Sequence, residues 1–267
     1  MSRPVADSLV VGAVAGILAT IVVGLLLFVQ PERGRRRFER LKVEVRTDPT
    51  ARLRFYRRGI VAAWVLTAVV GAIAALAHAA GHDVGLPPAP SDEAQGFIRF
   101  LTIEMAVLIP VSALVMRSRK AGIQRLVRRQ IGHLRALLPV TRQERLTFVA
   151  VALTAGICEE VVYRWFAIGY IRWLAPGSSD LVVVILIALA FGLAHYYQGR
   201  FGVLITGAAG GLFAWMTLQS GSIVPAMVVH ALIDLRVAAL RELPDQELAD
   251  EMLAKLRAAA ASPPRPV

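Results

Sequence analysis

Long apolar runs, separated by shorter polar segments, dominate the sequence. The runs occupy residues 8–29, 59–80, 98–116, 142–173, 181–197, 201–218 and 222–240. An α-helix rises ~1.5 Å per residue, so about 20 apolar residues cross the ~30 Å hydrocarbon core of a bilayer. The pattern therefore predicts an all-α fold, a polytopic integral membrane helical bundle with about seven transmembrane helices.

The charges lie mainly between these runs, and their sign changes from one segment to the next. Residues 31–58 and 117–139 are rich in Lys and Arg, whereas residues 81–97 contain acids but no Lys or Arg. Cytoplasmic loops of membrane proteins carry an excess of Lys and Arg. We therefore expect a multi-pass protein of the cell membrane with its amino terminus outside and its carboxyl terminus cytoplasmic. Topology also explains the net charge of +11, so we expect the lipid bilayer and no nucleic acid as a partner.

The chain divides into three predicted regions. Residues 1–140 form an N-terminal membrane region with two basic cytoplasmic segments, residues 141–240 a membrane core with polar residues inside its apolar runs, and residues 241–267 a cytoplasmic tail. Within the first region, apolar residues of 117–139 recur near helical spacing. This spacing fits either a basic amphipathic helix on the inner leaflet or a solvated linker helix. Glu104 interrupts an apolar run. It would either line a functional site or pair with a neighbouring side chain in a structural role.

Two adjacent carboxylates stand inside an apolar run, in the segment CEEVVYRW (158–165). Residues four apart share a helix face, so Glu160 is expected to pair with Arg164 and Glu159 to face elsewhere. Ionisable groups inside membrane segments are costly and are candidates for a functional site. One glutamate would then be structural, and the other would suit a general base. A buried ion-pair cluster that only locks helices together is the alternative.

Three more polar residues interrupt later apolar runs: His195, His230 and Asp234. His230 and Asp234 are four apart and should project side by side. Counted from the outer ends of their helices at ~1.5 Å per residue, Glu159, His195 and Asp234 reach similar depths, and His230 lies closer to the outer side. We therefore expect these side chains to converge on one site.

Three short motifs of the chain resemble the motifs of one protein family. EEVVYR (159–164) resembles the EExxxR motif of the CAAX-protease and bacteriocin-processing (CPBP, or Abi) intramembrane proteases, which include the type II CAAX prenyl endopeptidases. FGLAH (191–195) resembles the FxxxH motif of that family, and HALID (230–234) its HxxxN/D motif. The order and separation of the three also match, over roughly residues 145–240. Position 234 is Asp, where prenyl-protein-processing members typically carry Asn.

The resemblance implies an intramembrane endopeptidase that cleaves a peptide or membrane-associated protein with a glutamate-activated water. It implies that Glu159 is the general base and that His195 helps to hold the water. His230 and Asp234 would support the carbonyl oxygen as charge develops, unless Asp234 instead orients His230.

Three further residues would support the site. Glu160 and Arg164 would fix the helix, and Phe191 would pack beneath His195. The single cysteine, Cys158, fits a packing residue better than a nucleophile, because an apolar setting disfavours its thiolate.

We expect no cofactor, but a zinc version remains open. Glu159, His195 and His230 would supply three ligands, as in catalytic zinc sites, although the spacing is not that of HExxH. A catalytically inactive membrane scaffold of the same family is another alternative. A transporter with a proton relay is a third, although no duplicated half is apparent. The substrate and the oligomeric state do not follow from the sequence.

Overall fold

The computed structural model describes residues 3–82, 85–116, 118 and 132–240, and every regular element within them is helical. This confirms the predicted all-α bundle. In chain order the elements are α1 (Arg3–Gly24), η1 (Leu25–Val29), α2 (Gln30–Glu44), α3 (Ala51–Ala79), α4 (Asp92–Met116), η2 (Gly132–Leu137), α6 (Arg142–Glu160), η3 (Val161–Phe166), α7 (Ala167–Leu174), α8 (Asp180–Ala194), η4 (Tyr196–Gln198), α9 (Gly199–Ser220) and α10 (Val224–Ala238). η1 and η3 are π-helical, whereas η2 and η4 are 3-10 helices.

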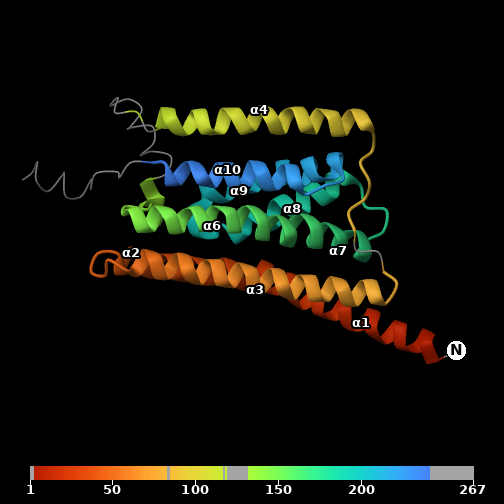
Figure 1. The fold of residues 1–267 in the computed structure, drawn as a ribbon. Helices are drawn as coiled ribbons and strands as arrows, with labels where there is room; N and C mark the ends of the chain where they lie inside the picture. Colours follow the sequence, from red (N-terminus) through yellow and green to blue (C-terminus); the bar gives the residue numbers. More distant parts are fainter. Residues whose placement is uncertain (1–2, 83–84, 117, 119–131, 241–267) are drawn as a thin grey trace, which may run out of the picture.

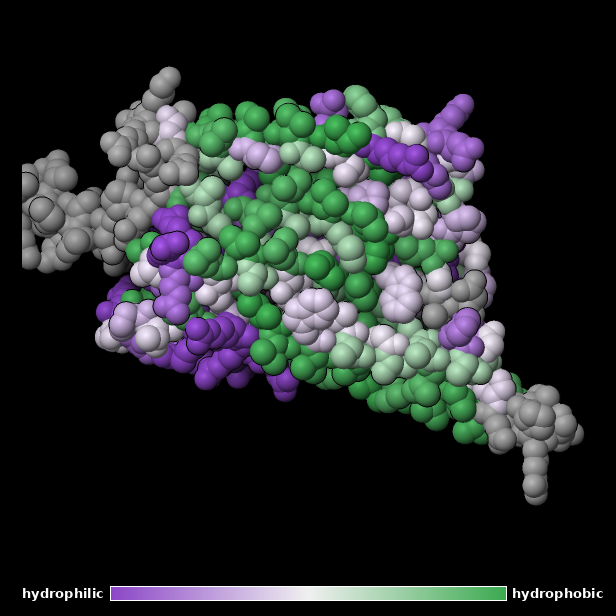
Figure 2. Space-filling model, viewed as in Figure 1, coloured by the Kyte–Doolittle hydropathy of each residue, from purple (hydrophilic) through white to green (hydrophobic). Residues whose placement is uncertain are grey.

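The helices run roughly alongside one another, with α1–α3 and α4 on opposite sides of the bundle (Figure 1). Between them lie α6, α8, α9 and α10, and both α3 and α10 pack against α6. The visible surface is apolar over the middle of the helices and hydrophilic mainly toward their ends (Figure 2). The central position of α6 places Glu159 and Glu160 inside the bundle.

Five helical segments in the described part of the chain are long and apolar enough to cross a membrane. They are Ser8–Glu44, Ala51–Ala79, Asp92–Met116, Arg142–Leu174 and Tyr196–Ser220. The other two rods of the predicted seven are short: α8 and α10 have 15 residues each, or ~22 Å of helix. Length and composition thus support a membrane protein, with two helices shorter than a full span.

The basic segment 31–58, expected as a loop, is mostly helical. α1 continues through η1 into α2, so that Ser8–Glu44 forms one 37-residue segment, ~55 Å long. Glu32 bonds Arg35 at 2.9 Å and Arg36 at 2.8 Å along the same helix. Oppositely charged side chains three or four residues apart stabilise an exposed helix. The basic residues alone therefore did not show where this helix ends.

A short turn joins α2 to α3 and contains a strongly hydrogen-bonded aspartate. The side-chain hydroxyl and the backbone N–H of Thr50 each donate to Asp48 at 2.7 Å, and Arg54 donates at 2.5 Å. These bonds lower the pKa of the Asp48 carboxyl to about 2. The carboxylate therefore stays ionised, and the turn closed, until well below neutral pH.

A capping box begins α6. Thr141 accepts a bond from the Glu144 backbone, while the Glu144 side chain bonds the Thr141 backbone in return. Arg52 of α3 lies 3.7 Å from the buried Glu144 carboxylate, which fixes α3 to this end of α6. Of the expected amphipathic helix, only 132–137 is described as regular structure, a 3-10 helix, and residues 117 and 119–131 lie outside the described residues.

Glycines bring helices into close contact. A Cβ on Gly210 of α9 would lie 2.8 Å from the Phe191 Cβ of α8, and one on Gly207 would lie 3.2 Å from the Ala188 carbonyl oxygen. A Cβ on Gly156 of α6 would lie 2.9 Å from the backbone nitrogen of Ala231 in α10. These contacts bring α6, α8, α9 and α10 together around the glutamates. The division at residues 140 and 240 remains a prediction, and the tail, 241–267, lies outside the described residues.

Candidate active site

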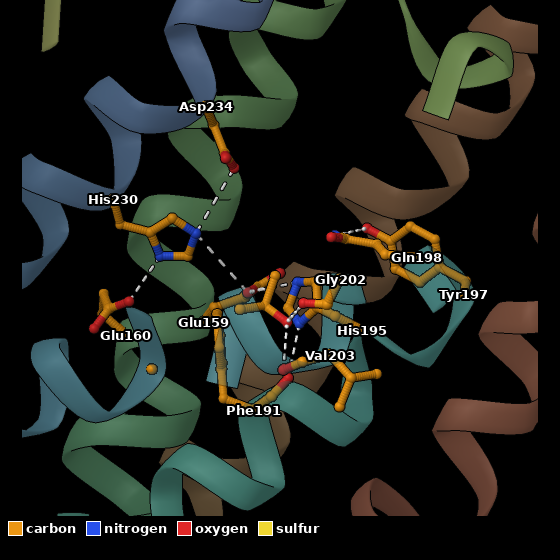
Figure 3. Close-up of polar contacts among 12 residues, drawn as sticks. Glu159, Glu160, Phe191, His195, Tyr197, Gln198, Gly202, Val203, His230 and Asp234 are labelled. Carbon is orange, nitrogen blue, oxygen red and sulfur yellow. Dashed lines mark hydrogen bonds and ion pairs between the residues drawn. The ribbon is translucent and has the colours of Figure 1, made fainter. Parts of the chain in front are cut away.

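The polar residues of the three motifs lie together at the meeting point of three helices (Figure 3). Glu159 and Glu160 end α6, His195 follows the last residue of α8, and His230 and Asp234 lie one turn apart on α10. His195, expected inside a span, instead caps α8. The expected convergence is therefore present in the structure.

Glu160 forms the expected pair with Arg164, and both side chains are fully buried. The Arg164 Nη1 donates to Glu160 Oε1 at 3.0 Å, and Nη2 donates to the Gly210 carbonyl oxygen at 3.2 Å. The same Glu160 oxygen lies 2.7 Å from His230 Nδ1. One carboxylate thus connects η3 and α9, through the arginine, to α10. Sequence spacing predicted only the first of these bonds.

Aromatic rings surround the buried guanidinium. The Arg164 Cζ lies 4.3 Å from the Phe191 ring centroid and 5.2 Å from that of Phe213. Phe213 also stacks on the His230 ring, with centroids 5.3 Å apart. Phe213 was missed by the sequence analysis, because an aromatic in a span of α9 gives no signal that distinguishes it from ordinary core.

Glu159 faces the two histidines without touching them. Its Oε2 lies 3.9 Å from His195 Nε2 and 4.0 Å from His230 Nε2. Both distances exceed a hydrogen bond and match groups bridged by one water-sized atom. The Oε2 atom is buried and has no hydrogen-bond partner among the described residues. Of the two adjacent glutamates, the Glu159 side chain is 31 % exposed and that of Glu160 is fully buried, so Glu159 is better placed to meet a substrate.

The orientation of His195 is set by its own helix. Its Nδ1 lies 2.8 Å from the Phe191 carbonyl oxygen, one turn back, and a carbonyl can only accept, so Nδ1 carries the proton. In a neutral ring, Nε2 is then an acceptor directed toward Glu159. The Phe191 ring packs against the imidazole, with centroids 4.6 Å apart, as expected for a residue beneath His195.

Asp234 stands beside His230 rather than apart from it. Its Oδ2 lies 3.7 Å from His230 Nε2, and its side chain is 36 % exposed, against 7 % for the histidine. The His230 ring is therefore placed between Glu160 on one nitrogen and Asp234 and Glu159 on the other. This geometry fits an aspartate that orients the histidine.

A chamber of about 630 Å³ opens beside these residues. Its walls are mainly apolar side chains of η1 and α3, and two arginines of α2, Arg33 and Arg37, stand in its lining. Glu159, Tyr163 and His195 line it from the site. The π-helical segments η1 and η3 both contribute to its wall, and such wide turns are frequent at functional sites.

Other sequence candidates lie in different surroundings. Cys158 is buried in α6, as a packing residue should be. Glu104 is exposed on α4 and does not line the chamber. No three His, Cys, Asp or Glu side chains within the described ranges are arranged to hold a metal ion together.

Comparison with known families identifies the segment that builds this site. Residues 141–236 match the family model described as type II CAAX prenyl endopeptidase Rce1-like. The family resemblance is thereby confirmed. No curated protein and no solved structure matches the chain.

The Rce1-like segment contains every residue of the three motifs, from α6 through most of α10. At the family level this segment is similar to CAAX-type endopeptidases. The arginines of the chamber and the whole of α1–α4 lie outside the matched residues. The site thus consists of a family segment together with a wall from a part of the chain that the family model does not cover.

Proposed function

We propose that the protein is an intramembrane endopeptidase that hydrolyses a peptide bond with a water activated by Glu159. One observation supports this most directly: Glu159 Oε2, buried and without a protein partner among the described residues, lies 3.9 and 4.0 Å from two imidazole nitrogens. A water between these groups would donate one hydrogen to Glu159 and the other to the acceptor nitrogen of His195. Its oxygen lone pair would then be free to attack.

The reaction divides into two steps. In the first, the water oxygen bonds to the carbonyl carbon, Glu159 takes a water proton, and the carbonyl electron pair moves onto the oxygen. In the second, the electron pair returns, the C–N bond breaks, and the leaving nitrogen takes the proton from Glu159. An acid and an amine result, and the carboxylate is restored. His230, held by Glu160 and Asp234, would support the charged intermediate from Nε2.

The chamber supports a peptide or membrane-protein substrate. Its apolar wall suits a segment that enters from the bilayer, and Arg33 and Arg37 give it a cationic part on α2. Arg35 and Arg36, in contrast, pair with Glu32. A carboxylate on the substrate would complement the two chamber arginines. The family description adds prenylated proteins as a substrate class to test.

Two alternatives remain proposals to be tested with the same preparation. A zinc enzyme would use Glu159, His195 and His230 as ligands, and would lose activity to a chelator and regain it with zinc. A scaffold of the same family would keep its cellular effect when Glu159 is neutralised. We place the protein in the cell membrane, with the carboxyl terminus in the cytoplasm.

The deciding experiment compares Glu159→Gln with the wild-type chain. Both proteins are purified, treated exhaustively with a chelator, and incubated with an equimolar library of synthetic peptides, unmodified and S-farnesylated. New peptide ends are then identified by mass spectrometry. We expect cleavage by the wild type only, because glutamine keeps the shape of the side chain and cannot accept the proton.

The matched control is Glu104→Gln, which removes a carboxylate outside the chamber and should cut normally. Cleavage by Glu159→Gln at the wild-type rate would place the chemistry elsewhere. Loss of wild-type activity on chelation, with recovery on adding zinc, would favour the metalloprotease.

A further inference from the structure

A buried hydroxyl next to Glu159 has no role in the mechanism described so far. Tyr163 is 5 % exposed, and its hydroxyl has no hydrogen-bond partner among the described residues. A buried polar group without a partner is costly, so such groups are rare in proteins and call for an explanation. A phenylalanine would fill the same space without that cost.

The other buried or half-buried tyrosines with described contacts are satisfied. The Tyr56 hydroxyl donates to the Leu137 carbonyl oxygen at 2.7 Å, Tyr170 shares a bond with Thr20 at 2.8 Å, and Tyr197 accepts from Gln198 at 3.2 Å. Tyr163 therefore differs from them in its hydroxyl and not in its ring.

Tyr163 lies in the chamber wall near Glu159. It lies four residues after Glu159, on the same side of the helix, and both residues line the chamber. The Tyr163 ring packs edge-on against Phe191, with centroids 5.2 Å apart, and Phe191 in turn holds His195. The Arg164 Cζ lies 6.0 Å from the Tyr163 ring centroid. The ring is thus fixed by packing, and the direction of the hydroxyl with it.

Two of the unpartnered buried atoms, both on residues that line the chamber, complement each other. Glu159 Oε2 can only accept while it is ionised, whereas the Tyr163 hydroxyl can donate. Hydrolysis needs a proton acceptor for the attacking water and a hydrogen-bond donor for the carbonyl oxygen, which gains negative charge. Glu159 can be that acceptor, and the Tyr163 hydroxyl, about one helical turn away, can be that donor.

Resting on the proposed function, we infer that Tyr163 is a catalytic residue whose hydroxyl donates a hydrogen bond to the carbonyl oxygen of the substrate. As water attacks and Glu159 takes its proton, the electron pair of the C=O bond moves onto that oxygen. The Tyr163 proton stays on the phenol oxygen throughout and stabilises the charge. When the C–N bond breaks, the carbonyl re-forms and the hydrogen bond weakens.

The test is Tyr163→Phe, measured on the library peptide that the wild type cuts fastest. Loss of one such donor lowers kcat by ~10²–10³-fold in other hydrolases, and we expect a fall of that size with KM unchanged. Because the removed hydroxyl has no hydrogen-bond partner in the described part of the chain, the melting temperature should stay the same or rise. Tyr170→Phe, which removes a hydroxyl bonded to Thr20 outside the chamber, is the control and should keep kcat.

Each outcome separates this inference from the proposed function. A Tyr163→Phe protein with wild-type kcat, next to an inactive Glu159→Gln protein, overturns the role of Tyr163 alone. A joint fall in kcat and melting temperature would show that the hydroxyl acts structurally, which also overturns it. A wild-type chain that cuts no library member overturns both proposals together.

Discussion

At the scale of single residues, the two glutamates of the EEVVYR motif differ in what holds them. Glu160 is fully buried and bonds Arg164 and His230, whereas Glu159 is 31 % exposed and faces its neighbours at 3.9 Å or more. A carboxylate that already bonds two partners is poorly placed to accept a proton from water, whereas a carboxylate that lines a chamber is well placed. Adjacent residues of the same type therefore have separate tasks, set by their contacts.

Glu160→Gln should for this reason act on folding, unlike Glu159→Gln. Removing one partner of a buried ion pair leaves the other charge uncompensated, which costs about 3–5 kcal/mol. We expect a large fall in the midpoint of thermal unfolding in detergent for Glu160→Gln, and little change for Glu159→Gln. Equal midpoints for the two variants would contradict a structural role for Glu160.

At the scale of elements, the site depends on how closely α6 and α10 approach. The two helices touch at Gly156 and Ala231, next to the residues that form the Glu160–His230 bond of 2.7 Å. A side chain at this contact would separate the helices and lengthen that bond. The position of the histidine thus depends on a residue that carries no chemistry of its own.

Gly156→Ala should accordingly reduce both stability and activity. The new Cβ would lie 2.8 Å from the Ala231 Cβ and 2.9 Å from its backbone nitrogen, and overpacking of this kind costs roughly 1–3 kcal/mol. The matched control is Gly71→Ala on α3, where nothing lies within 4 Å of the new Cβ. That change should leave activity intact and raise stability by about 0.5–1 kcal/mol. Thermal unfolding and peptide cleavage measure both effects, and normal cleavage by Gly156→Ala would refute the dependence.

The sequence predicted the helices and one contact of the site, but not the contacts between helices. The apolar runs located the helices, and the Glu160–Arg164 pair followed from a spacing of four. The Glu160–His230 bond joins residues 70 apart and depends on the packing of α6 on α10, which hydropathy does not encode. The continuation of α1 into α2 was missed because an Arg-rich segment is equally compatible with a loop and an exposed helix.

At the scale of the whole molecule, the bundle combines a family segment with a flanking wall. Residues 141–236 supply the motif side chains, and α1–α3, which lie outside the matched residues, contribute to the chamber wall. Differences in that wall would alter what reaches Glu159 without altering Glu159. Substrate choice is thus expected to depend on a part of the chain separate from the family motifs.

The orientation of the bundle in the membrane is the prediction that belongs to this scale. Reporter fusions within residues 31–58 and 117–140 should behave as cytoplasmic, and fusions within 81–97 as external, because the Lys and Arg excess lies in the first two segments. A fusion within 81–97 that behaves as cytoplasmic would reverse the topology. It would also place the arginines of the chamber on the outer side.

The π-helical turn η3 makes the site sensitive to chain length as well as to residue type. Glu159 and Glu160 precede this turn, and Tyr163 and Arg164 lie within it. Loss of a single codon between positions 161 and 166 would allow an ordinary α-helical turn, and every later side chain would rotate by ~100°. Ile168, which follows the turn and is fully buried in the core, would then turn away from its packing partners even though it was still encoded. A deletion in this stretch would therefore do harm that a mild substitution in the same place would not.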